Sequence, residues 1–231
     1  TINIVPSYTL KQNLNQINID SKYISNFSSL YPLNKKNIVP HKKEKNEIKL
    51  LWNSNILYSK GFYHLAEALL RIYKNGFSNF RLVILGRTLT DKYMKSVELD
   101  LYLNEFKKYP FVEYIGPVSN DKAYKYLFDS DIVCLPSFYP TECQPLSIID
   151  AIVANKYLLI SDNKYLLELT KDCERTIFNI PLDISCMYHE IQSLFCKSDL
   201  NIFDNINNKH ISKFKKEYFQ QNLESIFRDL K

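Results

Sequence analysis

Glycine is scarce in this sequence, and the glycine-rich loops that bind nucleotides in many proteins are absent. The 231 residues include only four glycines, and none of them forms a Gly-x-Gly-x-x-Gly or a Walker-type loop. The missing fingerprint argues against a nicotinamide-dependent oxidoreductase, although the chain shares the α/β pattern of that class. Because glycine is rare here, each glycine beside a predicted strand carries more information.

Long apolar runs, a signal peptide and paired cysteines are missing as well. No stretch approaches the ~18 consecutive apolar residues of a membrane-spanning helix. The five cysteines include no Cys-x-x-Cys pair, and the four histidines lack the neighbours of a catalytic triad or a metal site. These absences predict a protein of the reducing cytosol without a metal site or disulfide framework. The net charge of +5 suits an anionic ligand or an anionic membrane surface and does not predict nucleic-acid binding.

The chain divides into a lead-in at residues 1–47 and a regularly patterned domain at residues 48–231. The lead-in is rich in Asn, Ser and Lys and contains a charged run at 41–45, which is typical of a solvated loop. From Ile48 onward, apolar strand patterns alternate with helical ones. This alternation predicts an α/β fold with a parallel sheet of about six strands and helices on both faces. The predicted strands are Ile48–Trp52, Arg81–Leu85, Phe111–Ile115, Asp131–Leu135, Tyr157–Ile160 and Thr176–Ile180.

Five helices are predicted between and after these strands. Apolar residues recur at helical spacing from Phe62 to Ile72, and Gly76 stands where a C-terminal cap is expected. Pro145 suits the first turn of a later helix. The other helices are predicted at Asp91–Lys108, Asn120–Phe128 and Ser212–Leu230, the last with an apolar stripe.

Small and basic residues gather where strands end and helices begin. Gly61, Gly86 and Gly116 each follow a strand or precede a helix, where a doubly wound sheet has its ligand crevice. Lys60 lies between the first strand and the first helix, where its ammonium group could neutralise a diphosphate. Taken singly, each glycine also fits an ordinary turn, and Lys60 fits a solvated lysine.

Two carboxylates flank a predicted helix start. Glu142 lies on the loop before Pro145, and Asp150 falls in the second turn of the helix. The backbone N–H groups of Leu146 and Ser147 would be free to bind an anion. On spacing alone, Asp150 could equally be a solvent-facing helical acid, and Glu142 a partner of the helix dipole.

These residues resemble the C-terminal domain of a family 4 (group 1) retaining glycosyltransferase with the GT-B fold. The core of the resemblance is Pro136-Ser137 followed by Pro140-Thr141-Glu142-Cys143-Gln144-Pro145-Leu146-Ser147-Ile148-Ile149-Asp150-Ala151, which is similar to the family's Glu-x7-Glu signature. Supporting matches are Ser59-Lys60-Gly61, Leu82–Gly86 and Val112–Gly116. Four matches in the right order make the resemblance specific.

The resemblance implies a Rossmann-like donor-binding domain and a role for each site residue. Glu142 would contact the donor sugar as the catalytic residue, Asp150 the ribose hydroxyls, and Lys60 the diphosphate. The donor set also includes Gly61, Gly86, Gly116, Val118 beside the base, and the N–H groups of Leu146 and Ser147. The family needs no metal or cofactor for this chemistry, and the substrate would be a UDP- or GDP-linked sugar.

Several positions depart from the family pattern. Asn55 replaces the usual Arg, Cys143 replaces a common Gly, and Asp150 replaces the second Glu. Asn155 replaces the usual glycine after the helix, where Asn also tolerates the left-handed conformation. Asn55 and Cys143 support an alternative interpretation, a non-catalytic nucleotide-sugar-binding or assembly domain.

The family pattern also requires a second domain. Residues 1–47 are too short to be the acceptor-binding N-terminal domain, so they are interpreted as a linker leading in from it. The resemblance thus implies half of a transferase for bacterial surface polysaccharide. Its partners would be the missing domain and a saccharide or lipid-linked acceptor. The expected location is cytoplasmic, with the inner membrane face as an attachment site.

Overall fold

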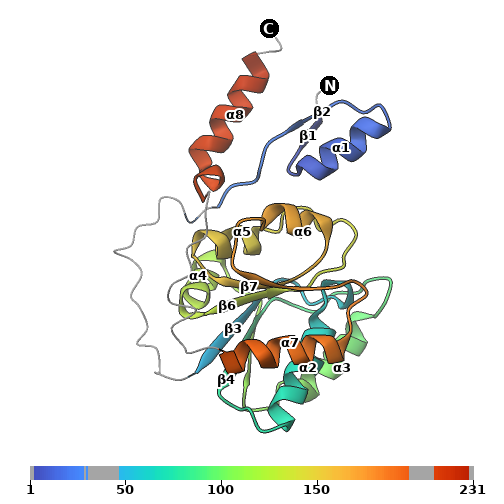
Figure 1. Ribbon diagram of the computed structural model, residues 1–231, viewed down its shortest axis with the longest axis vertical. Helices are drawn as coiled ribbons and strands as arrows, with labels where there is room; N and C mark the ends of the chain where they lie inside the picture. Colours follow the sequence, from blue (N-terminus) through green and yellow to red (C-terminus); the bar gives the residue numbers. More distant parts are fainter. Residues whose placement is uncertain (1–2, 29, 31–46, 198–210, 229–231) are drawn as a thin grey trace.

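A six-stranded parallel sheet forms the centre of the protein (Figure 1). The computed structural model describes residues 3–28, 30, 47–197 and 211–228. The strand order is β5-β4-β3-β6-β7-β8, and all pairings are parallel. This confirms the predicted fold class. The strands are β3 (Ile48–Asn53), β4 (Phe80–Leu85), β5 (Val112–Gly116), β6 (Ile132–Leu135), β7 (Tyr157–Ser161) and β8 (Arg175–Phe178).

Helices cover both faces of this sheet. Leu50, Leu51 and Trp52 are consecutive in β3 and fully buried, which is typical of a parallel strand packed on both sides. Helices α2, α3 and α7 lie on one face and α4, α5 and α6 on the other (Figure 1). Their bounds are α2 (Phe62–Lys74), α3 (Ser96–Phe106), α4 (Asn120–Asp129), α5 (Leu146–Val153), α6 (Lys164–Leu169) and α7 (Ile184–Lys197).

The direction of winding reverses between β3 and β6, which are neighbours in the sheet. From β3 the chain proceeds outward to β4 and β5, then returns to β6 and proceeds the opposite way to β7 and β8. The segments after β3 and β6 therefore lead to helices on opposite faces. Such a topological switch point opens a crevice at the carboxyl ends of the two strands.

Part of the lead-in, which was predicted as a linker, is regular. It contains β1 (Asn3–Val5), α1 (Tyr8–Gln16) and β2 (Ser21–Tyr23), and the two strands pair in parallel. The Ser7 hydroxyl caps α1 by accepting the Leu10 N–H at 3.2 Å. Glu168 of α6 accepts the N–H groups of Tyr8 and Thr9 at 2.7 and 2.9 Å, which holds the start of α1 against the domain. The role of residues 1–47 as a linker stays a prediction.

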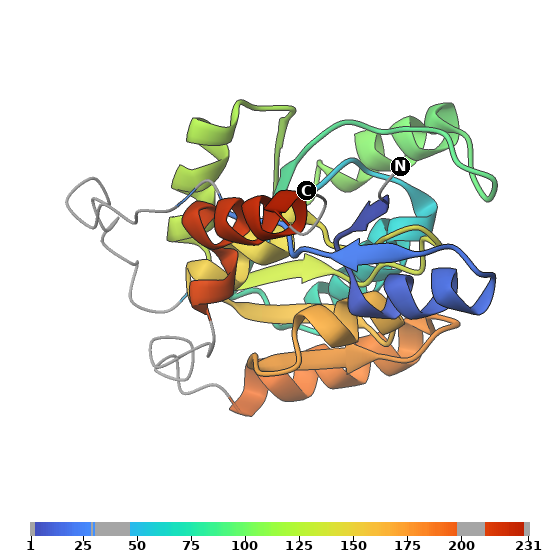
Figure 2. The same cartoon turned by 90° about the horizontal axis from the view of Figure 1, so that it is seen from above.

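The C-terminal segment packs beside this lead-in. The predicted helix Ser212–Leu230 divides into a 3₁₀ turn, η4 (Ile211–Phe214), and α8 (Lys216–Arg228), while Leu230 and the charged run 41–45 lie outside the described residues. Figure 2 shows α8 next to the β1–α1–β2 unit. The rings of Phe27 and Phe219 lie 5.1 Å apart, and the Ser28 N–H donates to the Phe214 carbonyl at 2.9 Å.

Some predicted boundaries are confirmed and others shift. Gly76 and Asn155 both adopt the left-handed conformation after a helix, with φ of 93° and 54°. The helix predicted from Asp91 begins only at Ser96, and β8 ends at Phe178 instead of Ile180. No helix in the described ranges is long and apolar enough to cross a membrane.

Candidate functional site

Lys60 and Glu142 meet at the switch point. Lys60 closes the 3₁₀ turn η2 (Tyr58–Lys60) that follows β3, and Glu142 lies on the loop between β6 and α5. The Lys60 Nζ atom is 3.2 Å from Glu142 Oε2, and the two side chains are 17% and 9% exposed. The fold thus brings together two residues that the sequence predicted as site members from different loops. Their charges compensate each other beyond the carboxyl ends of β3 and β6.

Serines at the ends of three strands hold this ion pair in place. Lys60 Nζ donates to Ser54 Oγ at 2.9 Å, just after β3. The Ser137 hydroxyl, just after β6, donates to Glu142 Oε2 at 3.2 Å. The hydroxyl of Ser161, the last residue of β7, donates in turn to the Ser137 carbonyl. Ser54 was not among the predicted site residues, because only the folded loop shows that its hydroxyl reaches Lys60.

The N-terminus of α5 opens toward the same loop. Pro145 is the N-cap, and no side chain caps the helix. Within the described part of the chain, no hydrogen bond occupies the backbone N–H groups of Leu146 and Ser147. These N–H groups and the helix dipole favour a negatively charged ligand. The anion-binding role of Leu146 and Ser147 stays a prediction.

Asp150 is buried and faces the lead-in. Its residue exposure is only 8%, so it is not the solvent-facing helical acid that the spacing also allowed. Burial raises its pKa to about 6, although a hydrogen bond from the Ser28 hydroxyl acts in the opposite direction. Ser28 lies 122 residues earlier in the chain, so this contact could not be predicted from sequence spacing. A carboxylate accepts up to about four hydrogen bonds, so Asp150 retains capacity for ligand hydroxyls.

Two of the three predicted site glycines permit close backbone packing. Gly61 has φ of 80°, and a Cβ there would lie 2.2 Å from the Pro136 carbonyl oxygen. Gly86 has φ of 113°, and a Cβ there would lie 2.2 Å from the Ser54 carbonyl oxygen. Both glycines therefore fix the loops that carry Lys60. Gly116, with φ of 81°, differs because a Cβ there would meet only the Tyr114 side chain, at 3.7 Å.

The remaining predicted positions lie around this centre. Val118 follows β5 and packs, half-buried, against the core. Cys143 is half-buried next to Ser7, and burial raises the pKa of its thiol. Asn55 is exposed, so the side chain that replaces the family's Arg makes no buried contact.

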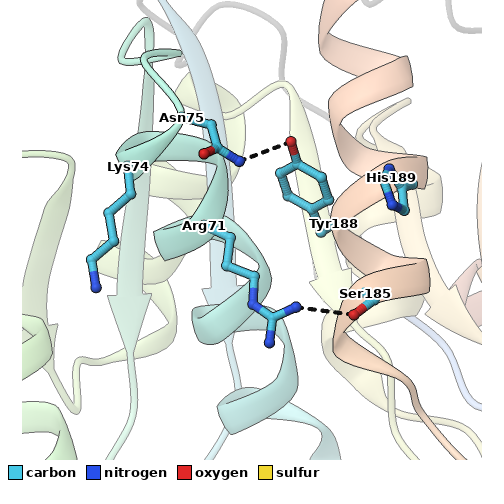
Figure 3. A pocket seen from close by; sticks show the side chains of 6 residues that line it. All are labelled: Arg71, Lys74, Asn75, Ser185, Tyr188 and His189. Carbon is cyan, nitrogen blue, oxygen red and sulfur yellow. Dashed lines mark hydrogen bonds between the residues drawn. The ribbon is translucent and has the colours of Figure 1, made fainter.

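A cavity of about 380 Å³ lies between α2 and α7 (Figure 3). Arg71 donates to the Ser185 hydroxyl at 3.0 Å, and Asn75 donates to the Tyr188 hydroxyl at 2.9 Å. Lys74 and His189 complete the lining. Arg71 lies about two and a half helical turns, roughly 13 Å along the axis, beyond Phe62, the first residue of α2. This cavity is thus separate from the switch point, and no predicted site residue lines it.

The fold and the switch-point residues together define a class of protein. A cation, an uncapped helix N-terminus and two buried carboxylates lie on the segments that follow the parallel strands β3 and β6. In doubly wound α/β proteins this is where phosphorylated ligands bind. Residues 34–198 match the family described as glycosyl transferases group 1, and the chain belongs to this family.

Solved structures agree with this fold. The chain superposes on sucrose-phosphate synthase from Thermosynechococcus elongatus with a TM-score of 0.72 and 16% identity, covering 99% of this chain and 58% of the synthase. Anabaena HepE, solved with UDP and glucose, gives a TM-score of 0.72 and 16% identity, with coverage of 97% and 62%. A glycosyltransferase from Rickettsia africae gives 0.72 and 20% identity, with coverage of 99% and 63%.

The chain therefore spans about three-fifths of the length of these structures. At these identities the likeness establishes the fold alone. No curated protein sequence matches the chain significantly.

Proposed function

We propose that this chain is the donor-binding part of a family 4 retaining glycosyltransferase, which transfers a sugar from a nucleoside-diphosphate sugar to a saccharide or glycolipid. The observation that carries this proposal is the contact between Lys60 and Glu142 at the switch point, beside the uncapped N-terminus of α5. Membership of the group 1 family supports it. The UDP and glucose in the HepE structure show that one protein of this fold binds such molecules.

Each site residue has a part in donor binding. Lys60 and the N–H groups of Leu146 and Ser147 bind the diphosphate, and Asp150 accepts hydrogen bonds from the ribose hydroxyls. Gly116 and Val118 flank the base. Glu142 contacts the donor sugar as the catalytic residue. Because Lys60 is paired with Glu142, its ammonium group must exchange that carboxylate for the diphosphate when the donor binds.

The chemistry needs no metal, because the chain itself supplies positive charge where charge develops. As the bond between the sugar and the diphosphate breaks, the leaving group gains negative charge. The Lys60 ammonium and the α5 N-terminus stabilise that charge. The acceptor hydroxyl attacks the face that the leaving group vacates and forms the new glycosidic bond with retention. Its proton passes to the departing diphosphate.

The whole enzyme extends beyond this chain. An N-terminal domain binds the acceptor, which is a saccharide or a lipid-linked sugar of a bacterial surface polysaccharide. The two-stranded β1–β2 sheet supports such a domain, since Ile4 and Tyr23 remain 42% and 38% exposed on it. The donor carries UDP or GDP. The enzyme works in the cytoplasm, at the inner face of the membrane.

A second candidate is a non-catalytic nucleotide-sugar-binding or assembly domain. It is favoured by the exposed Asn55, which leaves the diphosphate without a second cation at this position, and by Cys143. Both candidates bind a nucleotide, but only the glycosyltransferase transfers the sugar.

The experiment that tests the proposal measures the melting temperature of the protein with millimolar UDP, GDP or ADP. One of the three is expected to raise it, since a ligand at about 100 times its Kd stabilises the folded state by about 2.7 kcal/mol. If none of them does, the donor site is wrongly assigned. In the complete enzyme, Glu142→Gln is expected to keep nucleotide binding and to abolish sugar transfer. Nucleotide binding without transfer by the unmodified complete enzyme would favour the non-catalytic candidate.

A further inference from the structure

Asp91 makes an unusual set of contacts in the loop between β4 and α3. Its Oδ2 atom accepts the backbone N–H of Ser59 at 2.8 Å. Its Oδ1 atom accepts the N–H groups of Tyr93 and Met94 at 2.9 and 3.0 Å. Both oxygens are therefore used, one to shape the Asp91 loop itself and one to bind a different loop.

Ser59, the residue that Asp91 binds, joins three loops at the switch point. It is 1% exposed and immediately precedes Lys60 in the turn η2. Its N–H group, on the loop after β3, donates to Asp91, which lies on the loop after β4. Its carbonyl accepts the N–H of Phe138 at 2.8 Å, on the loop after β6 that also carries Glu142. The backbone that bears Lys60 is thus fixed on one side by Asp91 and on the other by the Glu142 loop.

Aromatic rings from the same three loops pack over this junction. The Tyr58 ring lies 6.0 Å from the rings of both Tyr93 and Phe138. Tyr93 and Phe138 also meet edge to face at 5.3 Å. Contacts between rings are less directional than a charged hydrogen bond, so they restrain η2 less sharply. The Asp91 carboxylate supplies the directional restraint.

Asp91 remains ionised at neutral pH. Partial burial acts to raise the pKa of this carboxyl, but the hydrogen bonds from Ser59, Tyr93 and Met94 prevail and leave it lowered. An ionised acceptor makes a stronger hydrogen bond than a neutral one.

We infer that Asp91 is a positioning residue for nucleoside-diphosphate binding, which holds η2 so that the Lys60 ammonium group faces the diphosphate. Asp91 acts through Ser59, since Lys60 Nζ itself contacts Ser54 and Glu142. The inference rests on the proposed function, because it requires Lys60 to bind the diphosphate. It adds Asp91, which was not among the predicted site residues, to the donor site. A displacement of about 1 Å at a binding group is enough to lower its contribution strongly.

The test is a double-mutant cycle on ligand affinity. The Kd is measured for whichever of UDP, GDP and ADP the unmodified protein binds most tightly. The variants are Asp91→Asn, Lys60→Met and the combination of both. The substitution Asp91→Asn replaces two acceptor oxygens by one carbonyl oxygen and one NH₂ group. At one of the contacts two hydrogen-bond donors then face each other. Asp100→Asn is the matched control, because Asp100 accepts a hydrogen bond from Thr88 at 2.5 Å in the same region and does not touch Ser59.

Asp91→Asn is expected to weaken nucleotide binding by at least about fivefold, which is the order of effect expected for a lost charged hydrogen bond. Asp100→Asn is expected to change the Kd by less than about twofold. In the Lys60→Met background, Asp91→Asn is expected to have no further effect. A merely structural role would instead lower the melting temperature and leave the Kd of the folded protein unchanged. Full affinity in Asp91→Asn, or effects that multiply in the double variant, would overturn the inference.

Failure of the proposed function gives a different pattern. In that case the unmodified protein binds no nucleotide, or Lys60→Met binds as tightly as the unmodified protein. Either result removes the basis for the role of Asp91 as well. If Asp91→Asn does not fold, the same cycle is run with Asp91→Glu, which retains the carboxylate but displaces it by one methylene.

Discussion

Asp150→Asn is expected to stabilise the folded protein at neutral pH while weakening nucleotide binding. The Asp150 carboxyl is 8% exposed, and burial raises its pKa from 3.8 to about 6. One pKa unit is worth about 1.36 kcal/mol, so the ionised carboxylate destabilises the folded state by up to about 3 kcal/mol. Asparagine fits the same space, carries no charge and can still accept the Ser28 hydroxyl.

The sign of the pH dependence follows from the raised pKa. Between about pH 4 and pH 6 the folded state binds a proton at Asp150 that the unfolded state has released, so stability falls as the pH rises through this window. The gain from Asp150→Asn should therefore be small at pH 4 and reach its full value above pH 6.5. Urea unfolding reports this gain through the single tryptophan, Trp52, which is fully buried.

Two results would refute this reasoning. The first is a stability difference between Asp150→Asn and the unmodified protein that does not vary with pH. The second is a stabilised variant that binds nucleotide with unchanged affinity, since the buried charge would then have no function to offset its cost. The control is Asp121→Asn in α4, an exposed acid whose replacement should change stability by less than about 1 kcal/mol.

Two further predictions concern the glycines and metal ions. Gly86→Ala should lower the unfolding free energy by more than about 2 kcal/mol in urea titrations, because positive φ and the Ser54 carbonyl both oppose a Cβ. Gly76→Ala, with similar φ but open space around it, should cost only about 1–2 kcal/mol, and equal losses would show that the close approach is unimportant. Nucleotide affinity measured by calorimetry should be the same with and without excess EDTA, since Lys60 and α5 supply the positive charge; a clear loss in EDTA would contradict the proposed metal-free site.

The order of strands and helices was predictable because the sheet is buried on both faces. Continuous apolar runs such as Leu50–Trp52 mark strands strongly, and Gly76 marks the end of α2. The start of α3 was misplaced because Asp91 takes up the N–H groups of Tyr93 and Met94 with its side chain, which delays the helix. A helical pattern does not show this competition.

The lead-in and the surroundings of the site were harder to predict because both depend on contacts between residues that are far apart in the sequence. Helix α1 is polar, and its start is held by Glu168, a residue far away in the sequence. The burial of Asp150 likewise depends on Ser28, and the position of Lys60 on Ser54 and Glu142. The motif predicts which residues belong to the site, whereas contacts between distant segments determine how these residues are held.

The most direct test of the account is a crystal structure of the protein with the nucleoside diphosphate that binds it best. The account predicts the diphosphate between Lys60 Nζ and the N–H groups of Leu146 and Ser147, with the ribose hydroxyls on Asp150. The Lys60–Glu142 contact of 3.2 Å should then be broken. A nucleotide bound elsewhere, for example in the cavity of Arg71 and Lys74 between α2 and α7, would contradict the assignment of the switch point as the donor site.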